Sequence, residues 1–450
     1  MGTRLSSSRL YGHLWGTSEL AGIFEETAML QRWLDVLVAL AAAQAELGIV
    51  PPEAAKVIAA CANVDALDLD FVAEQTRATS HSTLGLIRGL LAVLPEHARE
   101  HVYVGATVQD VTDTWFGLVM RDLGAVLWRD LRALEARLLE LAAEHRGTVM
   151  AGRTHGQLGA PITFGFKAAS WADEVRRHLE RLLGGRSRWA VGQLGGAVGG
   201  LGYFGTRGPE LRRLFCAELG LADPGISWLT ARDRIAEFGT TLAMVCGTLA
   251  RIGGEVYELA RPEIGELAEP APADGVSSIT MPHKRNPEAS EHLDTLARLA
   301  RSSAGVLLEG MVAGHERDGR AWKAEWIALP EVCQLAGVSV SLALGLIDGL
   351  EVHAEVMAAR VHASPGMGSE RVLAELAGRL GKHRAQALLQ DVLRHGDADP
   401  VEALSGRGVA TADEVRGWLG SPSLDAVTDM VDDVCRRAEV ARAAEPERWS

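Results

Sequence analysis

Residues 274–291 read DGVSSITMPHKRNPEASE, and the chain is organised around this stretch. It combines two serines, a His-Lys-Arg triplet, an asparagine and two prolines, and it then passes into a helical pattern. Pro287 stands where a helix accepts proline, and Glu288 and Glu291 follow in the first turn, where acidic side chains complement the helix dipole. The stretch therefore predicts a cationic loop that ends at the positive end of a helix, which is a place suited to hold an anion.

The composition is that of an ordinary globular protein. The 450 residues are 47% hydrophobic and 23% charged, enough for a large core and for two or three domains. A net charge of −14 argues against nucleic acid as the main partner, because phosphate binding needs a basic face. The start lacks a signal peptide's apolar core, and no apolar run reaches membrane-spanning length. Five scattered cysteines predict reduced thiols in a cytoplasmic protein, without disulfides or a zinc site.

The apolar residues follow a helical period almost throughout, and strand signals are nearly absent. A heptad seam of five leucines with charged flanks is typical of a long bundle helix: Leu127, Leu131, Leu134, Leu138 and Leu141. Similar patterns cover residues 25–47, 166–183, 236–259 and 288–308. The sequence therefore predicts an all-α fold with a central bundle of long helices. We expect an N-terminal helical domain (1–105), the bundle (106–350) and a small C-terminal helical domain (351–450).

Between these helices lie four short segments rich in Gly, Thr, His and Gln: residues 77–89, 102–115, 151–165 and 191–205. The last has seven glycines in fifteen residues. No strand precedes it and no Gly-Lys-Ser/Thr follows, so it is better interpreted as a tight packing turn than as a nucleotide cradle.

The loop segments together supply what proton abstraction beside a carboxylate requires. Removing such a proton builds negative charge on the carboxylate oxygens, which fixed donors and cations must stabilise. Lys284, Asn286 and the helix start at Pro287 would provide them. Ser278 is the candidate general base and His155 the candidate general acid.

These residues carry a resemblance. The stretch MPHKRNP after Ser277-Ser278 resembles the signature of the aspartase/fumarase superfamily, also called the adenylosuccinate/argininosuccinate lyase superfamily. The segments GATVQDVTDT and GRTHGQ are similar to its two other common regions, in the right order, and the resemblance covers nearly the whole chain. It implies a mostly helical subunit in a homotetramer with a twenty-helix core. It also implies active sites shared by three subunits and a cofactor-independent anti elimination that releases fumarate.

Aligned on Met281, the family's catalytic loop serine falls on Ser278. Ser277 then stands where glycine is usual, and Ile279 replaces a second serine. Thr154 and His155 match the pair whose histidine acts as general acid in adenylosuccinate lyases, and Glu291 matches the acidic residue that orients that histidine.

The resemblance also implies a set of substrate contacts. Thr107, Gln109 and Asp110 lie in the segment that binds a substrate carboxylate, although Val108 stands where a hydroxyl residue is common. Lys284 and Asn286 would complete the succinyl site. His81 resembles a second active-site histidine of adenylosuccinate lyases. Among the substrate contacts we also count Arg317, although both it and Trp322 fit packing in the bundle equally well.

Two branches compete. The opening YGHLWGTSELAGIFEE and the stretch GHERDGRAWKAEWIALPE resemble bacterial 3-carboxy-cis,cis-muconate cycloisomerases. The histidines His81 and His155 instead favour a lyase that protonates a leaving nitrogen. Residues 324–326 lack the arginine that adenylosuccinate lyases use for their nucleotide, which argues against AMP as the leaving group. We therefore expect a lyase that cleaves the C–N bond of an N-substituted aspartate, with Ser278 as base and His155 as acid. The cycloisomerase is the alternative, and a catalytically silent structural homologue is a third reading.

Overall fold

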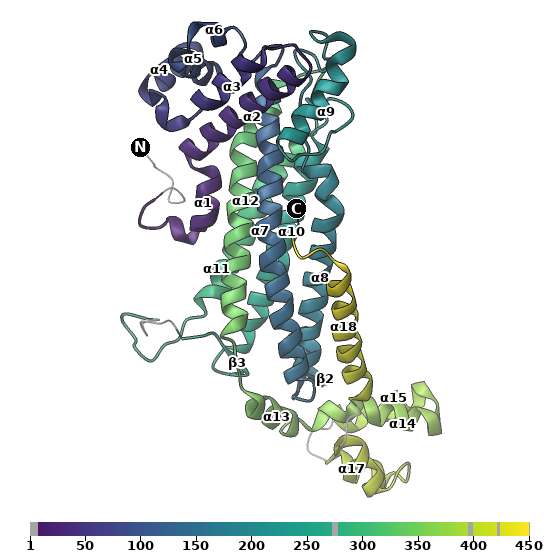
Figure 1. Ribbon diagram of the computed structural model, residues 1–450. Helices are drawn as coiled ribbons and strands as arrows, with labels where there is room; N and C mark the ends of the chain where they lie inside the picture. Colours follow the sequence, from purple (N-terminus) through teal and green to yellow (C-terminus); the bar gives the residue numbers. More distant parts are fainter. Residues whose placement is uncertain (1–7, 272–277, 395–398, 421–423, 450) are drawn as a thin grey trace.

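The computed structural model describes residues 8–271, 278–394, 399–420 and 424–449. Five long helices stand side by side, with a cap of short helices at one end and a second group of short helices at the other (Figure 1). The mostly helical fold predicted from the sequence is confirmed.

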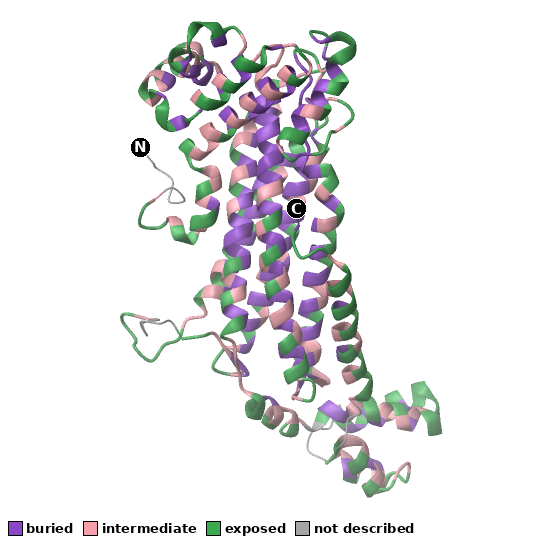
Figure 2. Ribbon diagram, in the orientation of Figure 1, coloured by how far each residue is buried: buried purple, intermediate pink, exposed green. Residues whose placement is uncertain are grey.

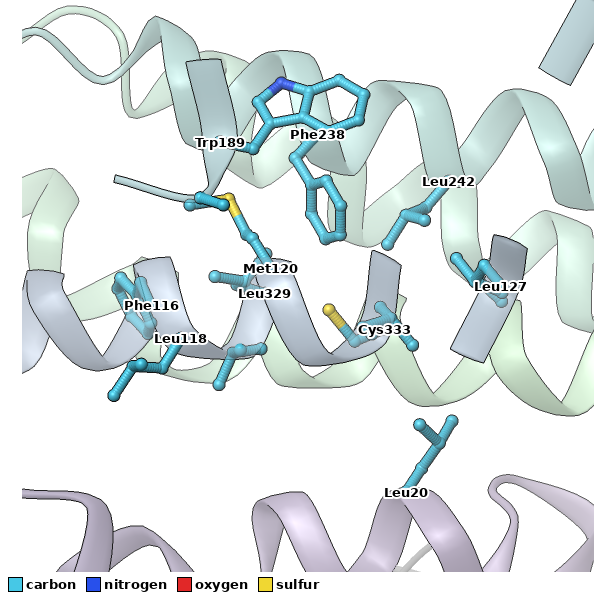
Figure 3. Packing of buried hydrophobic residues seen from close by; sticks show 14 of the residues in the cluster. Leu20, Phe116, Leu118, Met120, Leu127, Trp189, Phe238, Leu242, Leu329 and Cys333 are labelled. Atoms are coloured by element: carbon cyan, nitrogen blue, oxygen red, sulfur yellow. The ribbon is translucent and has the colours of Figure 1, made fainter. Parts of the chain in front are cut away.

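The central bundle contains the long helices that the apolar periodicity predicted. Its members are α7 (Val108–Glu144), α8 (Phe164–Trp189), α10 (Asp233–Leu259), α11 (Glu288–Glu309) and α12 (Gly319–Asp348). The five leucines of the predicted seam are all buried on α7, and Figure 2 shows the buried residues running along the inside of the bundle. Figure 3 shows how side chains of α7, α10 and α12 meet there, with Phe116, Phe238 and Leu329 among them.

Helices α10 and α11 approach each other closely. At Gly239 of α10, a Cβ atom would come within 2.3 Å of Leu307 Cδ1 on α11, so only glycine fits this crossing without movement. Both α10 and α12 are long and apolar enough to cross a membrane by composition, yet 61% of the most apolar window of each is buried in the protein. Both are therefore core helices of the bundle.

Most of the N-terminal region forms the cap at the α7 start, whereas residues 8–24 lie along the side of the bundle (Figure 1), where Trp15 contacts His292 of α11. The region's elements are η2 (Gly12–Leu14), α1 (Ser18–Phe24), α2 (Glu26–Glu46), α3 (Pro52–Cys61), η3 (Val64–Ala66), α4 (Leu69–Thr79), α5 (Leu84–Val93) and α6 (Glu96–Arg99). Between α8 and α10, η4 (Gly205–Arg207) and α9 (Gly208–Glu218) lie beside it, and α9 packs on α2 (Figure 1).

Two short antiparallel sheets lie at the opposite end, where the sequence suggested hardly any strand. Strands β1 (Val149–Thr154) and β2 (Gln157–Thr163) form a hairpin, and β3 (Leu267–Ala268) pairs with β4 (Glu351–Val352). The hairpin turns through His155 and Gly156, which both have positive φ, at 51° and 72°. That is the two-residue turn that fits the twist of a hairpin.

The C-terminal region divides into two parts. A separate small core, built from residues such as Val372, Leu376 and Leu404, joins the short helices. The region's elements are α13 (Ala354–His362), η5 (Pro365–Gly368), α14 (Ser369–Leu380), α15 (Lys382–Arg394), α16 (Pro400–Gly406), α17 (Ala412–Gly420) and α18 (Asp425–Ala444). Helix α18 instead runs back along α8 and α7 (Figure 1), and Trp449 is buried in the main core. Within residues 351–450, the described part of α18 therefore packs on the bundle, and the shorter helices surround the small core.

Candidate active site

The first group of predicted site residues lies where α7 begins. Thr107 is the N-cap of α7, and its N–H donates to Asp110 Oδ2 at 2.8 Å. Asp110 also accepts from the N–H groups of Gly195 (2.8 Å) and Gly196 (3.1 Å), which belong to the glycine-rich stretch. Burial raises the pKa of Asp110 to about 7, against the opposing effect of these three donors. The Asp110 carboxylate thus ties the glycine-rich turn to the start of α7.

Arg317 reaches the same place from the segment before α12. Its Nη2 donates to Thr107 Oγ1 at 2.7 Å and to the Gly196 carbonyl at 3.4 Å. Its Nε is buried and has no hydrogen-bond partner, and among the residues that the structure describes Arg317 forms no ion pair. A guanidinium with unused donors next to a hydroxyl group and a helix start can bind a carboxylate.

Tyr103 and Thr83 complete this group, and sequence reasoning missed both. The phenol of Tyr103 interacts with Thr83, Thr107, Asp110 and Arg317, and burial together with the Asp110 charge raises its pKa to about 12. Tyr103 has a positive φ of 62°, and the Thr83 hydroxyl beside it is buried. Tyr103 lay within the 102–115 segment, but nothing in the sequence indicated its backbone conformation. We call Thr83, Tyr103, Thr107 and Arg317 the Arg317 cluster.

The side chain of Gln109 lies inside the bundle and not in the Arg317 cluster. It is fully buried and its Nε2 donates to Asp113 Oδ2 (3.0 Å) and to the Leu229 carbonyl (2.7 Å). Asp113 in turn pairs with Arg232, which also pairs with the buried Glu325. Gln109 thereby belongs to a charged network inside the bundle, away from the open side of the Arg317 cluster.

His81 lies on the turn between α4 and α5, directly before Ser82 and Thr83. Its side chain is exposed, and its Nδ1 accepts from the Leu84 N–H at 3.2 Å. Trp322 is 7% exposed and makes an edge-to-face contact with Trp326, with ring centroids 5.0 Å apart, so of the two interpretations the packing one fits this residue.

His155 and Thr154 lie at the tip of the β1–β2 hairpin, both exposed. Below the tip, Arg153 donates to both carboxylate oxygens of Glu266 (2.9 and 2.7 Å), the residue before β3. This fixes the hairpin next to the base of the signature loop, which leaves the bundle after β3.

Ser278 lies in the described part of that loop, which projects from the bundle (Figure 1). Its Oγ accepts from the Met281 N–H at 3.1 Å. The side chain of Ile279 is 94% exposed, and Lys284 is exposed as well. Ser277 lies outside the described residues. Within one chain, residues 279–285 of the loop are therefore exposed to solvent.

The helix start after the loop already holds an anion from the chain itself. Glu269 accepts from the N–H groups of Ala289 (3.1 Å) and Ser290 (2.8 Å) and from the Ser290 hydroxyl (2.6 Å). Pro287 is the N-cap of α11, and the expectation that this helix start is open to a substrate anion is corrected by Glu269. Asn286 lines a cavity of about 290 Å³ beside Glu269 and Arg285, while Glu291 is exposed on the first turn.

One chain does not bring the predicted residues together. Helix α7 has 37 residues and so is about 55 Å long, with Thr107 before its first residue and the hairpin of His155 after its last. Thr107, Asp110 and Arg317 meet at the start of this helix. His155 and the base of the loop with Ser278, Lys284 and Asn286 lie toward its other end. No single chain can close all these groups around one small molecule.

Comparison with known proteins gives the class. A family model described as lyase matches residues 15–300, and the chain belongs to this family, within the aspartase/fumarase superfamily. The chain is 40% identical to the N-acetyl-S-(2-succino)cysteine lyase of Dickeya dadantii, over 87% of this chain and 86% of that protein.

Two further likenesses represent the two branches named above. The adenylosuccinate lyase of Methanocaldococcus jannaschii is 37% identical, over 84% of this chain and 82% of that one. The crystal structure of the 3-carboxy-cis,cis-muconate lactonizing enzyme from Pseudomonas putida has a TM-score of 0.88 at 30% identity, covering 96% and 99% of the two chains. The predicted family is confirmed, and so is its placement between these branches.

Proposed function

We propose that this lyase cleaves a succinyl adduct by β-elimination and releases fumarate. The observation that carries the proposal is the Arg317 cluster, where the guanidinium meets the Thr107 hydroxyl at 2.7 Å and keeps donors for an incoming carboxylate. A dicarboxylate substrate suits a cation placed this way in a chain of net charge −14.

In the proposed reaction, Ser278 removes a proton from the carbon next to one substrate carboxylate. The electron pair of that C–H bond forms the C=C bond of fumarate, and the bond from the neighbouring carbon to the leaving atom breaks with its electrons on that atom. His155 gives a proton to a leaving nitrogen. Lys284 and Asn286 stabilise the charge that builds on the carboxylate. Serine is a weak base in water, so the loop must close over the substrate and exclude water.

The leaving atom decides how much the acid matters. The sequence predicts a nitrogen, whereas the Dickeya relative is named for a succinylated cysteine, in which a sulfur leaves. A thiol has a pKa near 8.5 and departs readily as thiolate, while an amine needs a proton as it leaves. We place both adduct types in the test, and an S-(2-succino) thiol is the first candidate because the identity to that relative is 40%.

We further propose a homotetramer in which three chains build each site. Support comes from the distance between the Arg317 cluster and His155 within one chain, and from apolar side chains that this chain leaves exposed. Several lie on the loop and on α10 and α11: Ile279 (94%), Met244 (46%), Leu299 (42%), Val306 (41%) and Leu308 (49%).

A panel of substrates tests the activity. Purified protein is mixed with an S-(2-succino) thiol, an N-succinyl amine and 3-carboxymuconate in parallel, and ultraviolet absorbance is followed. Appearance of fumarate with an adduct supports the lyase, and Ser278→Ala should abolish it. Consumption of the muconate alone would support the cycloisomerase, which the likeness to the Pseudomonas putida enzyme keeps as the second candidate. Turnover of none of them contradicts both proposals and leaves the silent homologue.

A further inference from the structure

Glu266 is a buried carboxylate that joins three parts of the chain. Its side chain is 0% exposed, and it accepts two hydrogen bonds from Arg153 of β1, at 2.9 and 2.7 Å. Arg360 of α13 also approaches it, with Nε 3.3 Å from Oε1. A buried carboxylate needs cations and hydrogen bonds to compensate for its lost hydration, and here two guanidinium groups are in place to do so. The hairpin, the start of β3 and α13 therefore meet at one carboxylate.

The backbone of Glu266 is held as well as its side chain. Its N–H donates to the Leu259 carbonyl at the end of α10 (2.9 Å), and its carbonyl accepts from the His353 N–H (3.0 Å). The guanidinium of Arg360 is itself anchored, because its Nη2 donates to two backbone carbonyls of the segment before β3, at 2.8 and 3.0 Å. Glu266 is therefore a fixed point that can orient Arg153.

Arg153 stands at the edge of the hairpin tip. Residues 154–158, which include the turn at His155, are all exposed. Between Ala151 and Arg153 the strand register shifts, and such irregularities re-aim neighbouring side chains. The side chain of Arg153 is only 17% exposed, since its guanidinium contacts Glu266. The direction of the tip, and with it the place of His155, thus depends on where Glu266 holds Arg153.

The two ends of the signature loop are held by contacts of their own. Glu269 accepts from the N–H groups at the start of α11, as described above. Arg285 donates to Glu351 at 2.8 Å and to the Glu269 carbonyl at 2.7 Å. These contacts do not involve the carboxylate of Glu266. A change at Glu266 should therefore displace the hairpin tip more than the loop that carries Ser278.

We propose that Arg153 and Glu266 are positioning residues for His155. The pair sets the direction in which the hairpin tip presents the imidazole to the leaving atom, and neither of the two touches the substrate. This inference rests on the proposed function, in which His155 gives a proton to the leaving group. A general acid works only within hydrogen-bond reach of its target, so a shift of the tip by about 1 Å should slow bond cleavage while substrate binding is kept.

Leaving groups of different acidity test the proposal. Glu266→Gln keeps the shape of the side chain but removes its charge. Fumarate release is measured from four adducts, which are the S-(2-succino) forms of an aryl and an alkyl thiol and the N-(2-succino) forms of an aryl and an alkyl amine. The less acidic the leaving group, the more it needs a proton as it departs.

We expect kcat of Glu266→Gln to fall by about ten-fold or more for the least acidic leaving group that the unaltered protein releases. For the aryl thiol, the loss should be less than about three-fold. KM should change less than about two-fold for every adduct, because the succinyl half binds at the Arg317 cluster, at the other end of α7. A merely structural role would lower kcat equally for all adducts.

Arg153→Lys tests the same contact from the other partner. It keeps the positive charge but loses the planar fork, so its losses should follow the same order among the leaving groups and be smaller. His155→Asn removes the acid itself, and its losses should follow the same order and be larger. Equal losses for all adducts in both Glu266→Gln and Arg153→Lys, or no loss in either, would overturn the proposal.

The matched control is Glu135→Gln. Glu135 of α7 is also 0% exposed and also faces two arginines, Arg176 of α8 (2.9 Å) and Arg442 of α18 (2.8 Å). Its substitution should lower the melting temperature about as much as that of Glu266 and leave the order of the leaving groups unchanged. Absence of fumarate from every adduct would mean that the proposed function fails. Fumarate release in which only His155→Asn distinguishes the leaving groups would mean that this inference alone fails.

Discussion

Arg317 is an arginine whose role depends on geometry that lysine cannot reproduce. Its Nη2 holds the Thr107 hydroxyl while its Nε stays unpaired. Arg317→Lys keeps the charge but loses the planar pair of donors, so we expect kcat/KM for a succinyl adduct to fall by about ten-fold to a hundred-fold. Steady-state kinetics measures this change. Thr107→Val, which removes the hydroxyl at similar volume, should have a smaller effect, and an unchanged KM in Arg317→Lys would argue against a carboxylate contact.

The Ser278 hydroxyl accepts a hydrogen bond from the Met281 N–H at 3.1 Å. Because this lies in an exposed loop, Ser278→Ala should leave the melting temperature unchanged. If Ser278 is the base, turnover should fall by about a thousand-fold or more. Differential scanning calorimetry measures the melting temperature, and the fumarate assay measures the turnover. Retention of most of the activity would remove Ser278 from the proposed role.

Single residues show where sequence reasoning reached its limit. The motif predicted Thr107 as a substrate contact, and Arg317 was counted as one although packing fitted it equally well; the structure places the two side chains together. The motif could not reveal that the Asp110 carboxylate accepts hydrogen bonds from the N–H groups of Gly195 and Gly196. Those glycines are distant in sequence, and only the fold brings them near. The same holds for Tyr103, whose contribution depends on a positive φ rather than on a pattern.

At the scale of elements, helices α8 and α10 are joined by a buried histidine. His178 Nε2 lies 2.8 Å from Thr248 Oγ1, and that hydroxyl donates to Glu174, so Nε2 donates its hydrogen to Thr248. Arg181 Nη1 donates to Nδ1 at 3.2 Å, so Nδ1 carries no hydrogen and the ring is neutral. Burial is the main cause that lowers the pKa of His178 from 6.5 to about 4, and nearby Arg181 acts in the same direction.

This contact predicts acid sensitivity. Between pH 6.5 and about 4 the unfolded chain binds a proton at His178 and the folded chain does not, so the free energy of unfolding should fall as the pH drops through this window. Above pH 6.5 the stabilisation that depends on a neutral His178 is fully present. Its complete loss at low pH lowers the free energy of unfolding by at most about 3 kcal/mol. Urea unfolding at a series of pH values measures it. His178→Gln keeps a donor without the titration and should flatten the curve in that window.

The sequence predicted helices well and strands poorly, for a physical reason. Leu127 to Leu141 repeat with a period that only a helix turns into one buried face, so α7 could be foreseen. The β1–β2 hairpin depends on a two-residue turn at His155 and Gly156, a dipeptide outside the usual Asn-Gly signal. The return of α18 to the bundle was equally invisible, because it depends on distant ion pairs such as that of Glu445 with Arg132 and Arg176.

At the scale of the whole molecule, the Arg317 cluster and His155 lie at opposite ends of α7. This arrangement predicts how oligomers mixed from two inactive variants behave. If Arg317 and His155 act at one site but come from different chains because they lie at opposite ends of α7, Arg317→Ala and His155→Asn are each inactive alone. Unfolding and refolding them together should produce mixed oligomers in which some sites contain both intact residues. We expect about a quarter of the original activity when the mixture is equal and the chains combine at random with four sites per tetramer.

Two measurements accompany this experiment. Light scattering should give four times the mass of one chain, and each variant refolded by itself should remain inactive. Mixed samples without recovered activity would mean that both residues act within one chain or that one of them has no catalytic part. An N-substituted substrate is the appropriate one, because a thiolate can leave without His155.

Glu269 has a consequence for how the signature loop is attached. Its carboxylate holds the N–H groups of Ala289 and Ser290, so the chain leaves the bundle and returns to it at nearly the same point. The two ends of the loop are thus held in place by the bundle, independently of the residues between them. Its length and sequence can be changed at a small entropic cost, since the closure penalty grows only slowly with loop size. Reactivity can therefore be altered in this stretch while the bundle remains as it is.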